Sequence, residues 1–447
     1  MSLATIHQRL EDIASVTISG RVVKAVGLTL EGTGLGASVG QRCHIFSTRG
    51  QSLVEGEVIG FREQRVVVMP FGAVRGIAAG NLIRYDSPSP RLLVGTQMLG
   101  RVVDGLGHPL DEKGPLSRSR RYALYAPAPA PMLRERITTP MDLGIRAINA
   151  LLTCGVGQKL GIFAGSGVGK SVLMGTMCRH TSADVNVIAL VGERGREVRE
   201  FLERDLGREG LRRSVVVVAT SDQSPLVRVR AAFVATAIAE FFRDQGNQVL
   251  LLVDSLTRLA HAQREVGLAA GEPPTTKGYP PSVFTLFPQV LERVGPVGRG
   301  SITGLYTVLV DGDDLNDPIA DSIRSILDGH IVLSRRLAMQ GHFPAIDVLQ
   351  SVSRVMSDIA SKTHQEAARY LVQMMAEYRN AEDLINLGVY QSGTNPRLDA
   401  AIRMKGPIDT FLRQTREEGV KISESCEGLE SLAQQGRRLL ERKGKAV

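Results

Sequence analysis

A glycine-rich turn at residues 164–171 carries the strongest chemical signal in the chain. It has the sequence AGSGVGKS, follows the apolar run 160–164 and precedes a segment, 172–179, that favours a helix. Glycines let backbone N–H groups approach a phosphate closely, and the N-terminus of the following helix adds a favourable dipole. The turn therefore predicts a nucleotide site, formed by Gly165, Ser166, Gly167, Val168, Gly169, Lys170, Ser171 and Val172.

The last two residues of the turn suit a nucleoside triphosphate and its magnesium ion. Lys170 is expected to reach the terminal phosphates, and the Ser171 hydroxyl is expected to ligate Mg²⁺. The first position of the strict motif is usually glycine and is Ala164 here. With alanine allowed, chains of this length match by chance roughly three times in a hundred, so a coincidental turn is the weaker interpretation.

Acidic residues follow two of the apolar runs. Asp254 ends one run and Glu193 follows another, with Arg194 beside it. Ligands bind at the carboxyl ends of parallel strands, so Asp254 is expected to hold Mg²⁺ from its outer side. The spacing fits two roles for Glu193 equally well. It either orients the water that attacks the phosphate or caps the helix that follows.

The composition narrows the classes of function. The chain has 447 residues, 43% apolar and 22% charged, as in soluble globular proteins. No apolar stretch is long enough to cross a bilayer, and the N-terminus lacks the features of a secretory signal, so we expect a cytoplasmic protein. The four cysteines are widely spaced, which favours free thiols. Aromatic residues make up 4% and tryptophan is absent, so no nucleic-acid partner is expected.

Changes of pattern along the chain predict an α/β fold with four parts. Residues 1–15 form a helix with one apolar stripe, which either packs on its own domain or docks on a partner. Residues 16–92 form a small β-barrel from closely spaced short strands. Residues 93–355 form a phosphate-loop domain with a mostly parallel sheet, and residues 356–447 form a helical domain. The sheet strands are expected at 160–164, 185–192, 214–219, 249–253 and 305–310.

Four motifs occur in a fixed order and together carry a family resemblance. They are the phosphate loop, residues 192–197 (GERGRE), residues 254–258 (DSLTR) and residues 342–354 (HFPAIDVLQSVSR). The set resembles the catalytic subunits of rotary ATP synthases and, more closely, the type III export ATPases of flagella and injectisomes. Synthase loops usually begin with glycine and end with threonine, whereas this loop runs from Ala164 to Ser171. Residues 146–154 and 349–354 favour the flagellar branch.

The resemblance implies a RecA-like P-loop core and gives roles to individual residues. Glu193 would position and polarise the attacking water, and Glu197 would support the Mg²⁺ shell. Arg194 and Arg258 would contact the terminal phosphate region. Phe343 occupies a position where synthases carry tyrosine, and its ring would stack on the adenine.

The resemblance also implies a ring with several partners. Arg354 would be an arginine finger that reaches the site of the next subunit, so identical subunits would form a closed homohexamer. A central stalk protein would pass through the channel beside residues 265–284, for which an ordinary surface loop is the alternative. A regulatory or peripheral-stalk protein would bind the N-terminal helix through Leu3, Ile6, Leu10 and Ile13. The export gate, chaperones and export substrates would meet the C-terminal domain on the inner face of the cell membrane.

Other activities use the same core and leave different marks on a sequence. A rotary synthase subunit would show the glycine-to-threonine loop. A hexameric RNA helicase would need clustered aromatics near its N-terminus, and a degenerate, nucleotide-holding subunit would have lost Glu193 or Arg354. We therefore expect ATP and Mg²⁺ as cofactors and ATP hydrolysis that energises type III export of flagellar components. An injectisome ATPase is the main alternative.

Overall fold

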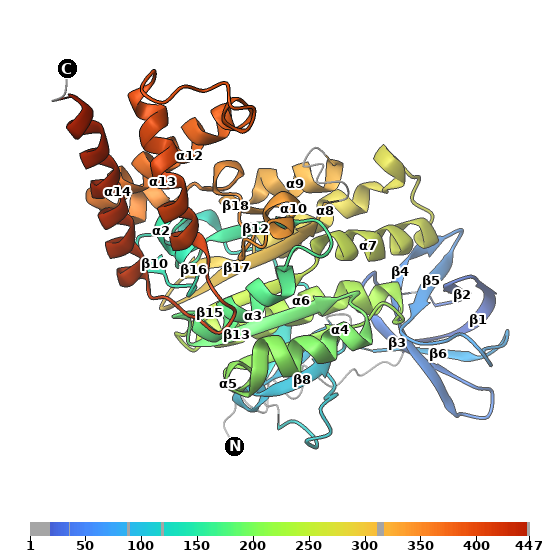
Figure 1. The fold of residues 1–447 in the computed structure, drawn as a ribbon. Helices are drawn as coiled ribbons and strands as arrows, with labels where there is room; N and C mark the ends of the chain where they lie inside the picture. The colour runs from blue at the N-terminus through green and yellow to red at the C-terminus, as the bar shows by residue number, and fades with distance from the viewer. Residues whose placement is uncertain (1–17, 35, 87–89, 118–119, 311–316, 445–447) are drawn as a thin grey trace.

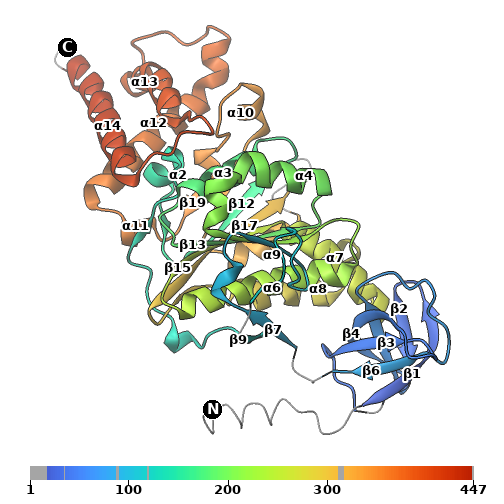
Figure 2. The same ribbon diagram turned by 90° about the horizontal axis from the view of Figure 1, so that it is seen from below.

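The computed structural model describes residues 18–34, 36–86, 90–117, 120–310 and 317–444. The helix expected within residues 1–15 lies outside the described residues. The barrel lies at one end of the molecule and the C-terminal helices at the other, with the large sheet between them (Figures 1 and 2). None of the helices over the described residues has the length and apolar character needed to cross a membrane.

Six short strands close into the N-terminal barrel. Their order around the barrel is β1-β2-β5-β4-β3-β6, and every neighbouring pair is antiparallel. Inward-facing apolar side chains, among them Leu30, Ile45 and Val68, form a separate small core. The strands are β1 (Ser19–Val26), β2 (Thr29–Gly32), β3 (Arg42–Phe46), β4 (Ser52–Arg62), β5 (Arg65–Pro70) and β6 (Leu82–Tyr85).

A nine-stranded, mostly parallel sheet forms the centre of the molecule, in the order β19-β18-β12-β17-β15-β13-β14-β8, with β16 paired to β17. Only the β16–β17 and β18–β19 pairs are antiparallel among its described pairings. Its strands are β8 (Arg101–Asp104), β12 (Lys159–Ala164), β13 (Val185–Val191), β14 (Ser214–Ala219), β15 (Gln248–Asp254), β16 (Gly295–Val297), β17 (Gly300–Leu309), β18 (Gly329–Leu333) and β19 (Val352–Ser353).

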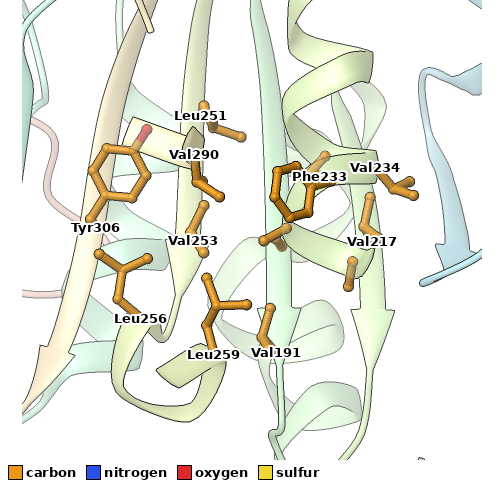
Figure 3. Close-up of a cluster of buried hydrophobic side chains, with 14 of the residues drawn as sticks. Val191, Val217, Phe233, Val234, Leu251, Val253, Leu256, Leu259, Val290 and Tyr306 are labelled. Atoms are coloured by element: carbon orange, nitrogen blue, oxygen red, sulfur yellow. The ribbon is translucent and has the colours of Figure 1, made fainter. Parts of the chain in front are cut away.

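Helices cover both faces of this sheet, which explains why its strands are apolar throughout. Alternate residues enter two cores: Leu251 and Val253 pack with α6 and α7 (Figure 3), whereas Leu250 and Leu252 pack on the opposite side with α2 and α3. The first layer is α6 (Pro225–Asp244), α7 (Leu256–Ala270), α8 (Pro281–Leu291) and α9 (Pro318–Ile326). The second is α2 (Arg146–Leu151), α3 (Lys170–His180), α4 (Gly195–Glu200), a π-helical turn (Phe201–Leu206) and α5 (Gly207–Arg212).

The C-terminal part is helical, as predicted, and packs against the second of these layers. Its long helices share a core with α2 and α3. Gly388 (φ +70°) and Gly393 (φ +101°) lie in the turn that separates two of them. The helices are α11 (Met356–Ile359), α12 (Lys362–Asn386), α13 (Pro396–Leu412) and α14 (Ile422–Gly444), while the short α10 (Arg335–Met339) lies earlier, between β18 and β19.

Two short strand pairs and one buried contact complete the connections between the parts. β7 (Arg91–Val94) pairs with β9 (Arg120–Ala123), and β10 (Pro140–Met141) pairs with β11 (Cys154–Gly155). Glu57 of the barrel accepts hydrogen bonds from the Tyr125 hydroxyl (2.9 Å) and from Arg230 of α6. Burial raises the pKa of the Glu57 carboxyl, while Arg230 opposes that shift. The barrel is thereby fixed to the central domain by a buried polar contact.

The segment expected to face a ring channel is shorter than the sequence suggests. Within residues 265–284, α7 extends to Ala270 and α8 begins at Pro281, so 271–280 form the connecting loop. Tyr279 in this loop is 8% exposed and stacks on His261, with ring centroids 6.1 Å apart. Lys277 points outward instead and pairs with Asp317 at 2.9 Å.

Candidate active site

The phosphate loop joins β12 to α3 with the geometry that the sequence predicts. Gly167 (φ +79°) and Gly169 (φ +88°) adopt left-handed conformations that side chains disfavour. Gly169 is the residue before α3, and no side chain caps this helix end. The first N–H groups of α3 are therefore available to an anion.

A cleft with a volume of about 390 Å³ opens over this loop and brings most of the predicted site residues together. Glu193 and Glu197 come from the end of β13 and from α4, and Arg258 comes from α7. Sequence reasoning missed Glu200, Arg204 and Asp205, which line the same cleft. The loop residues that line it are Gly165, Ser166, Gly167, Gly169, Lys170, Ser171 and Val172.

Lys170 and Asp254 meet beneath the loop. Asp254, at the end of β15, is 2% exposed and accepts a hydrogen bond from the Lys170 ammonium. The hydroxyl of Thr307 on β17 donates to the same carboxylate at 2.6 Å. Thr307 lies on the neighbouring strand and belongs to no motif, so the sequence offered no signal for it.

The residues around Lys170 fit a magnesium ion bound together with a nucleotide. In the described part of the chain, no three His, Cys, Asp or Glu side chains gather into a metal cage. Mg²⁺ seldom uses such a cage, because it keeps several waters and is held by one or two carboxylates and the substrate phosphates. Ser171 follows Lys170 directly in the chain, and Asp254 contacts the Lys170 ammonium. A hydroxyl group and one carboxylate therefore lie on either side of the lysine that is expected to bind the phosphates.

Glu193 is held inside the cleft rather than at a helix cap. It is 8% exposed, its Oε2 lies 2.6 Å from Nη1 of Arg258, and its Oε1 lies 3.9 Å from Nζ of Lys170. Burial, a hydrogen bond with Glu197 and the charge of Asp254 raise the pKa of Glu193 to about 7, against the opposing effect of both cations. The same hydrogen bond lowers the pKa of Glu197. A carboxyl group with a pKa near 7 is suited to accept a proton at neutral pH.

The two predicted arginines differ in position. Arg258 donates to the carbonyl of Gly192 at 2.7 Å, and Gly192 (φ +71°) leaves room for its side chain. Arg194 precedes α4, its side chain is 77% exposed, and it pairs with Glu197 at 3.6 Å. The structure thus brings Arg258 into the cleft and leaves Arg194 on its outer side, so a contact from Arg194 to the terminal phosphate stays a prediction.

A second, more apolar cavity of about 560 Å³ adjoins the loop and suits a nucleotide base. Phe343 lines it with 45% exposure, and its ring lies against Gly169. The backbone N–H of Gln414 donates to the Phe343 carbonyl at 2.9 Å. Residues 413–416 and 418 form the far wall; the sequence analysis missed them because they lie in a connection between helices without a recognisable motif. Val168, predicted in the loop, also lines this cavity.

Arg354 lies away from the cleft of its own chain. It follows β19, the outermost strand at one edge of the sheet, and is exposed. Its backbone N–H donates to the Asp328 carbonyl at 3.0 Å, and its Nη1 donates to the Leu327 carbonyl at 3.2 Å. These contacts hold the backbone and one guanidinium nitrogen of Arg354 on its own chain, and the side chain is otherwise exposed at the edge of the sheet.

Comparison with known proteins agrees with this geometry. Residues 144–353 match the model of the ATP synthase alpha/beta family, nucleotide-binding domain, and residues 360–431 match the T3SS EscN ATPase C-terminal domain. The flagellum-specific ATP synthase of Bacillus subtilis is 51% identical over 431 residues, which cover 95% of this chain and 98% of the relative. The type 3 secretion system ATPase of Sinorhizobium fredii is 47% identical over 417 residues, which cover 93% of this chain and 92% of the relative.

Solved structures give the same result. The assembled ATPase EscN from the enteropathogenic E. coli type III secretion system superposes with a TM-score of 0.88 at 45% identity, covering 93% of this chain and all of EscN. EscN in complex with its central stalk EscO superposes with a TM-score of 0.86 at 44% identity, again covering 93% of this chain and all of EscN. The chain therefore belongs to the type III export ATPase family, related to the ATP synthase alpha/beta family, and is a P-loop ATPase of type III protein export.

Proposed function

We propose that this chain hydrolyses ATP with Mg²⁺ at sites shared between the subunits of a homohexamer, and that it energises export of flagellar components. The observation that carries the catalytic part is the position of Glu193, buried beside the phosphate loop with its pKa raised to about 7. The flagellar assignment is supported by relatives such as the 51% identical protein of B. subtilis.

The phosphate loop and Lys170 bind the triphosphate, and Lys170 exchanges its contact with Asp254 for the terminal phosphates. Ser171 and Asp254 hold the magnesium ion, with Glu197 supporting its shell. When bound, Mg²⁺ neutralises charge on the phosphate oxygens. Phe343 stacks on the adenine from the apolar cavity. These contacts fix the terminal phosphate above Glu193.

Glu193 orients the water that attacks the terminal phosphate and accepts its proton. Arg258, 2.6 Å away, holds the carboxylate in place and contacts the terminal phosphate region together with Arg194. Because the Glu193 pKa is near 7, the deprotonated form that the reaction needs is well populated at neutral pH.

The transition state receives its last positive charge from the next subunit. Arg354 is exposed at the sheet edge, away from its own cleft, and acts as an arginine finger on the neighbouring site. Such a group contributes about a thousandfold or more to the rate. Hydrolysis then requires a closed ring, in which every subunit supplies both halves of a site.

The parts of the chain serve different partners in this proposal. Residues 1–15 bind a regulatory or peripheral-stalk protein, the barrel within 16–92 joins the ring, and 93–355 carry the ATPase site. A central stalk protein occupies the channel, by analogy with the solved complex of EscN and EscO. The helical domain within 356–447 meets the export gate, chaperones and substrates at the cytoplasmic face of the membrane.

A deletion strain tests the export role. The gene is removed from the source bacterium and restored as wild type or as Lys170→Ala, and filament protein in the medium is measured with motility. We expect the wild type to restore both and Lys170→Ala to restore neither, at equal protein levels. The second candidate function is that of an injectisome ATPase, which the 47% identical S. fredii protein supports. If the deletion abolishes secretion of injectisome effectors and leaves the flagella intact, this second function is the correct one.

A further inference from the structure

The strand that leads to Arg354 is very short. β19 consists of Val352 and Ser353 and pairs with the start of β18 through His330 and Gly329. It is shorter than most strands in globular proteins and supplies few hydrogen bonds of its own. The position of Arg354 therefore depends on contacts that come from other segments.

Two successive carbonyl groups hold Arg354 on its own chain. Its backbone N–H donates to the Asp328 carbonyl at 3.0 Å, and its Nη1 donates to the Leu327 carbonyl at 3.2 Å. Residues 327–328 form the connection between α9 and β18, and the Leu327 side chain is buried. The guanidinium group is therefore placed by the contacts that hold this connection in position.

Gln158 holds this connection from the inside of the molecule. It lies in the turn between β11 and β12 and is fully buried, with 0% exposure. Its Nε2 donates to the Asp328 carbonyl at 3.2 Å, so this carbonyl accepts hydrogen bonds from both Gln158 and Arg354. The same Nε2 donates to the Ser353 hydroxyl at 3.1 Å. One amide group thus contacts both the connection that holds the arginine and the strand that precedes it.

The orientation of this amide is fixed by its partners. Its Oε1 accepts from the Gly155 N–H at 2.9 Å, a group that can only donate, whereas the Asp328 carbonyl on the other side can only accept. The Ser353 hydroxyl accepts from Gln158 and donates to the Thr153 carbonyl at 2.7 Å. A buried polar network whose members are paired in this way is rigid, so the Gln158 side chain has one favoured arrangement.

Gln158 is remote from the nucleotide site of its own chain. It precedes β12, whereas the phosphate loop follows the other end of that strand. Among the described residues that line the nucleotide cleft and the base cavity, neither Gln158 nor Ser353 occurs. A change at Gln158 is therefore expected to act through Arg354, on a site that belongs to another subunit.

We propose that Gln158 is a positioning residue for the arginine finger and that Ser353 assists it. The amide sets the place of Arg354 by holding the Asp328 carbonyl and the strand before the finger. This inference rests on the proposed function, in which Arg354 completes the neighbouring site. In a ring, Gln158 of one subunit thereby governs hydrolysis at the site of the next without touching either nucleotide.

Replacement of Gln158 by methionine tests this role in a steady-state ATPase assay. Gln158→Met keeps the length of the side chain and removes its hydrogen bonds. Because a misplacement of about 1 Å costs up to about a hundredfold in rate, we expect kcat to fall about ten- to a hundredfold. KM for ATP should stay close to the wild-type value, since the cleft of the variant is unchanged. An unchanged kcat would overturn the proposal.

A second buried amide provides the matched control. Asn186 is also 0% exposed, and its amide donates to the Cys178 carbonyl at 2.9 Å and to the Ser214 hydroxyl at 3.3 Å. Asn186→Leu thus removes a buried amide whose described partners lie in α3 and β14 rather than beside Arg354. Its kcat should stay close to the wild type even where Tm falls. An equal loss of kcat in both variants would show a general effect of lost packing and would contradict the proposal.

Mixed rings show whether the defect lies in the finger or in the cleft. Gln158→Met keeps its own Glu193, so rings that combine it with Glu193→Gln should recover up to about a quarter of the wild-type rate. Rings that combine it with Arg354→Ala should show no recovery, since neither variant offers a well-placed finger. When both changes are in one chain, Gln158→Met should leave the residual rate of Arg354→Ala unchanged, because changes that act through the same group do not add.

The mixture of Arg354→Ala with Glu193→Gln separates this inference from the proposed function. If that mixture recovers activity and the mixture of Gln158→Met with Glu193→Gln does not, Gln158 has no role in placing the finger. If neither mixture recovers, the shared site itself is refuted, and this inference with it. Ser353→Ala removes one hydroxyl and should give the same pattern with a smaller loss of kcat, which keeps the test available if Gln158→Met does not fold.

Discussion

Arg258 Nη1 lies 2.6 Å from the Glu193 carboxylate and also donates to the Gly192 carbonyl at 2.7 Å. One guanidinium group thus holds both the candidate base and the strand end that carries it. Ser255 caps the helix on which Arg258 stands, which fixes the arginine in turn. Although Arg258 and Lys170 both favour the charged form of Glu193, burial has the larger effect and raises the pKa of Glu193 to about 7.

Replacing Glu193 separates catalysis from binding. Glu193→Gln keeps the shape of the side chain but cannot accept a proton, so we expect the ATPase rate to fall about 10²–10⁴-fold with nucleotide affinity within a few-fold of the wild type. Titration with a fluorescent ATP analogue, beside a steady-state assay, measures both. A variant that loses binding as strongly as rate would assign Glu193 to nucleotide binding instead.

The raised pKa also predicts the effect of Glu193 on stability. Its pKa is higher in the folded protein than the ordinary value of 4.5, so its stabilising contribution is complete below pH 4.5 and is lost as the pH rises through 7. Glu193→Gln has no ionisable group at this position, so it does not lose stability as the pH rises. At pH 8 and without nucleotide, its Tm should exceed that of the wild type, and the difference should shrink at pH 5. If the Tm of the variant lies below that of the wild type at both pH 8 and pH 5, burial of the ionised Glu193 carboxylate does not destabilise the fold.

The pH dependence of catalysis tests the pairing of Glu193 with Glu197. Their hydrogen bond stabilises protonated Glu193, so kcat/KM of the wild type should fall as the pH drops below about 7. Glu197→Gln removes the negative charge from the acceptor, and the amide can donate to ionised Glu193 instead, so the acid limb should move to lower pH. Each curve is normalised to its own plateau, and titration of ATP itself affects both enzymes equally. Coincident acid limbs would show that the pair does not set the pKa.

Thr307 offers a test of the magnesium site. Thr307→Val keeps the shape but removes the 2.6 Å hydrogen bond to Asp254, and residues that orient a metal-binding carboxylate affect metal affinity by about 10–100-fold. We expect Mg²⁺-dependent binding of a fluorescent nucleotide to need about tenfold more Mg²⁺, and Thr307→Ser to restore it. If serine and valine behave alike, the hydroxyl has no such role.

Phe343 provides a test of the base pocket. Phe343→Ala removes the ring beside Gly169, and loss of one aromatic stack on a base costs about 1–3 kcal/mol, so KM for ATP should rise about tenfold or more. Phe343→Tyr keeps the ring and should stay close to the wild type. Tripolyphosphate, which has no base, serves as a control because its binding should not distinguish the three proteins. If Phe343→Ala weakens the binding of ATP and of tripolyphosphate equally, the ring does not act on the base.

Features with strong local patterns were predictable from the sequence. The strand at Ser214–Ala219 has the predicted limits, and the loop around Lys170 has the predicted strand and helix on either side. These signals are local, because a parallel strand buried on both faces must be apolar throughout and a phosphate loop must contain glycines. β2 (Thr29–Gly32) has no such local pattern, since its four residues include Glu31 and Gly32 and its pairing depends on neighbouring strands.

Contacts between distant segments could not be predicted in the same way. Thr307 reaches Asp254 only because β15 and β17 are neighbours in the sheet. The wall of the base cavity at 413–416 depends on how the C-terminal helices pack against α2 and α3. Tyr279 is buried on His261 although it lies in a loop, and a sequence does not show which way a loop side chain points.

The shared active site is the central claim, and mixing two inactive variants tests it most directly. Arg354→Ala retains its own Glu193 but offers no finger, whereas Glu193→Gln offers a finger but has no base. In rings assembled from equal amounts of both, the finger of one variant meets the intact cleft of the other at about a quarter of the interfaces. We predict that the mixture recovers up to about a quarter of the wild-type ATPase rate, while each variant alone stays nearly inactive. Full activity of Arg354→Ala alone, or no recovery in mixed rings that assemble and bind nucleotide, would contradict a finger supplied by the neighbouring subunit.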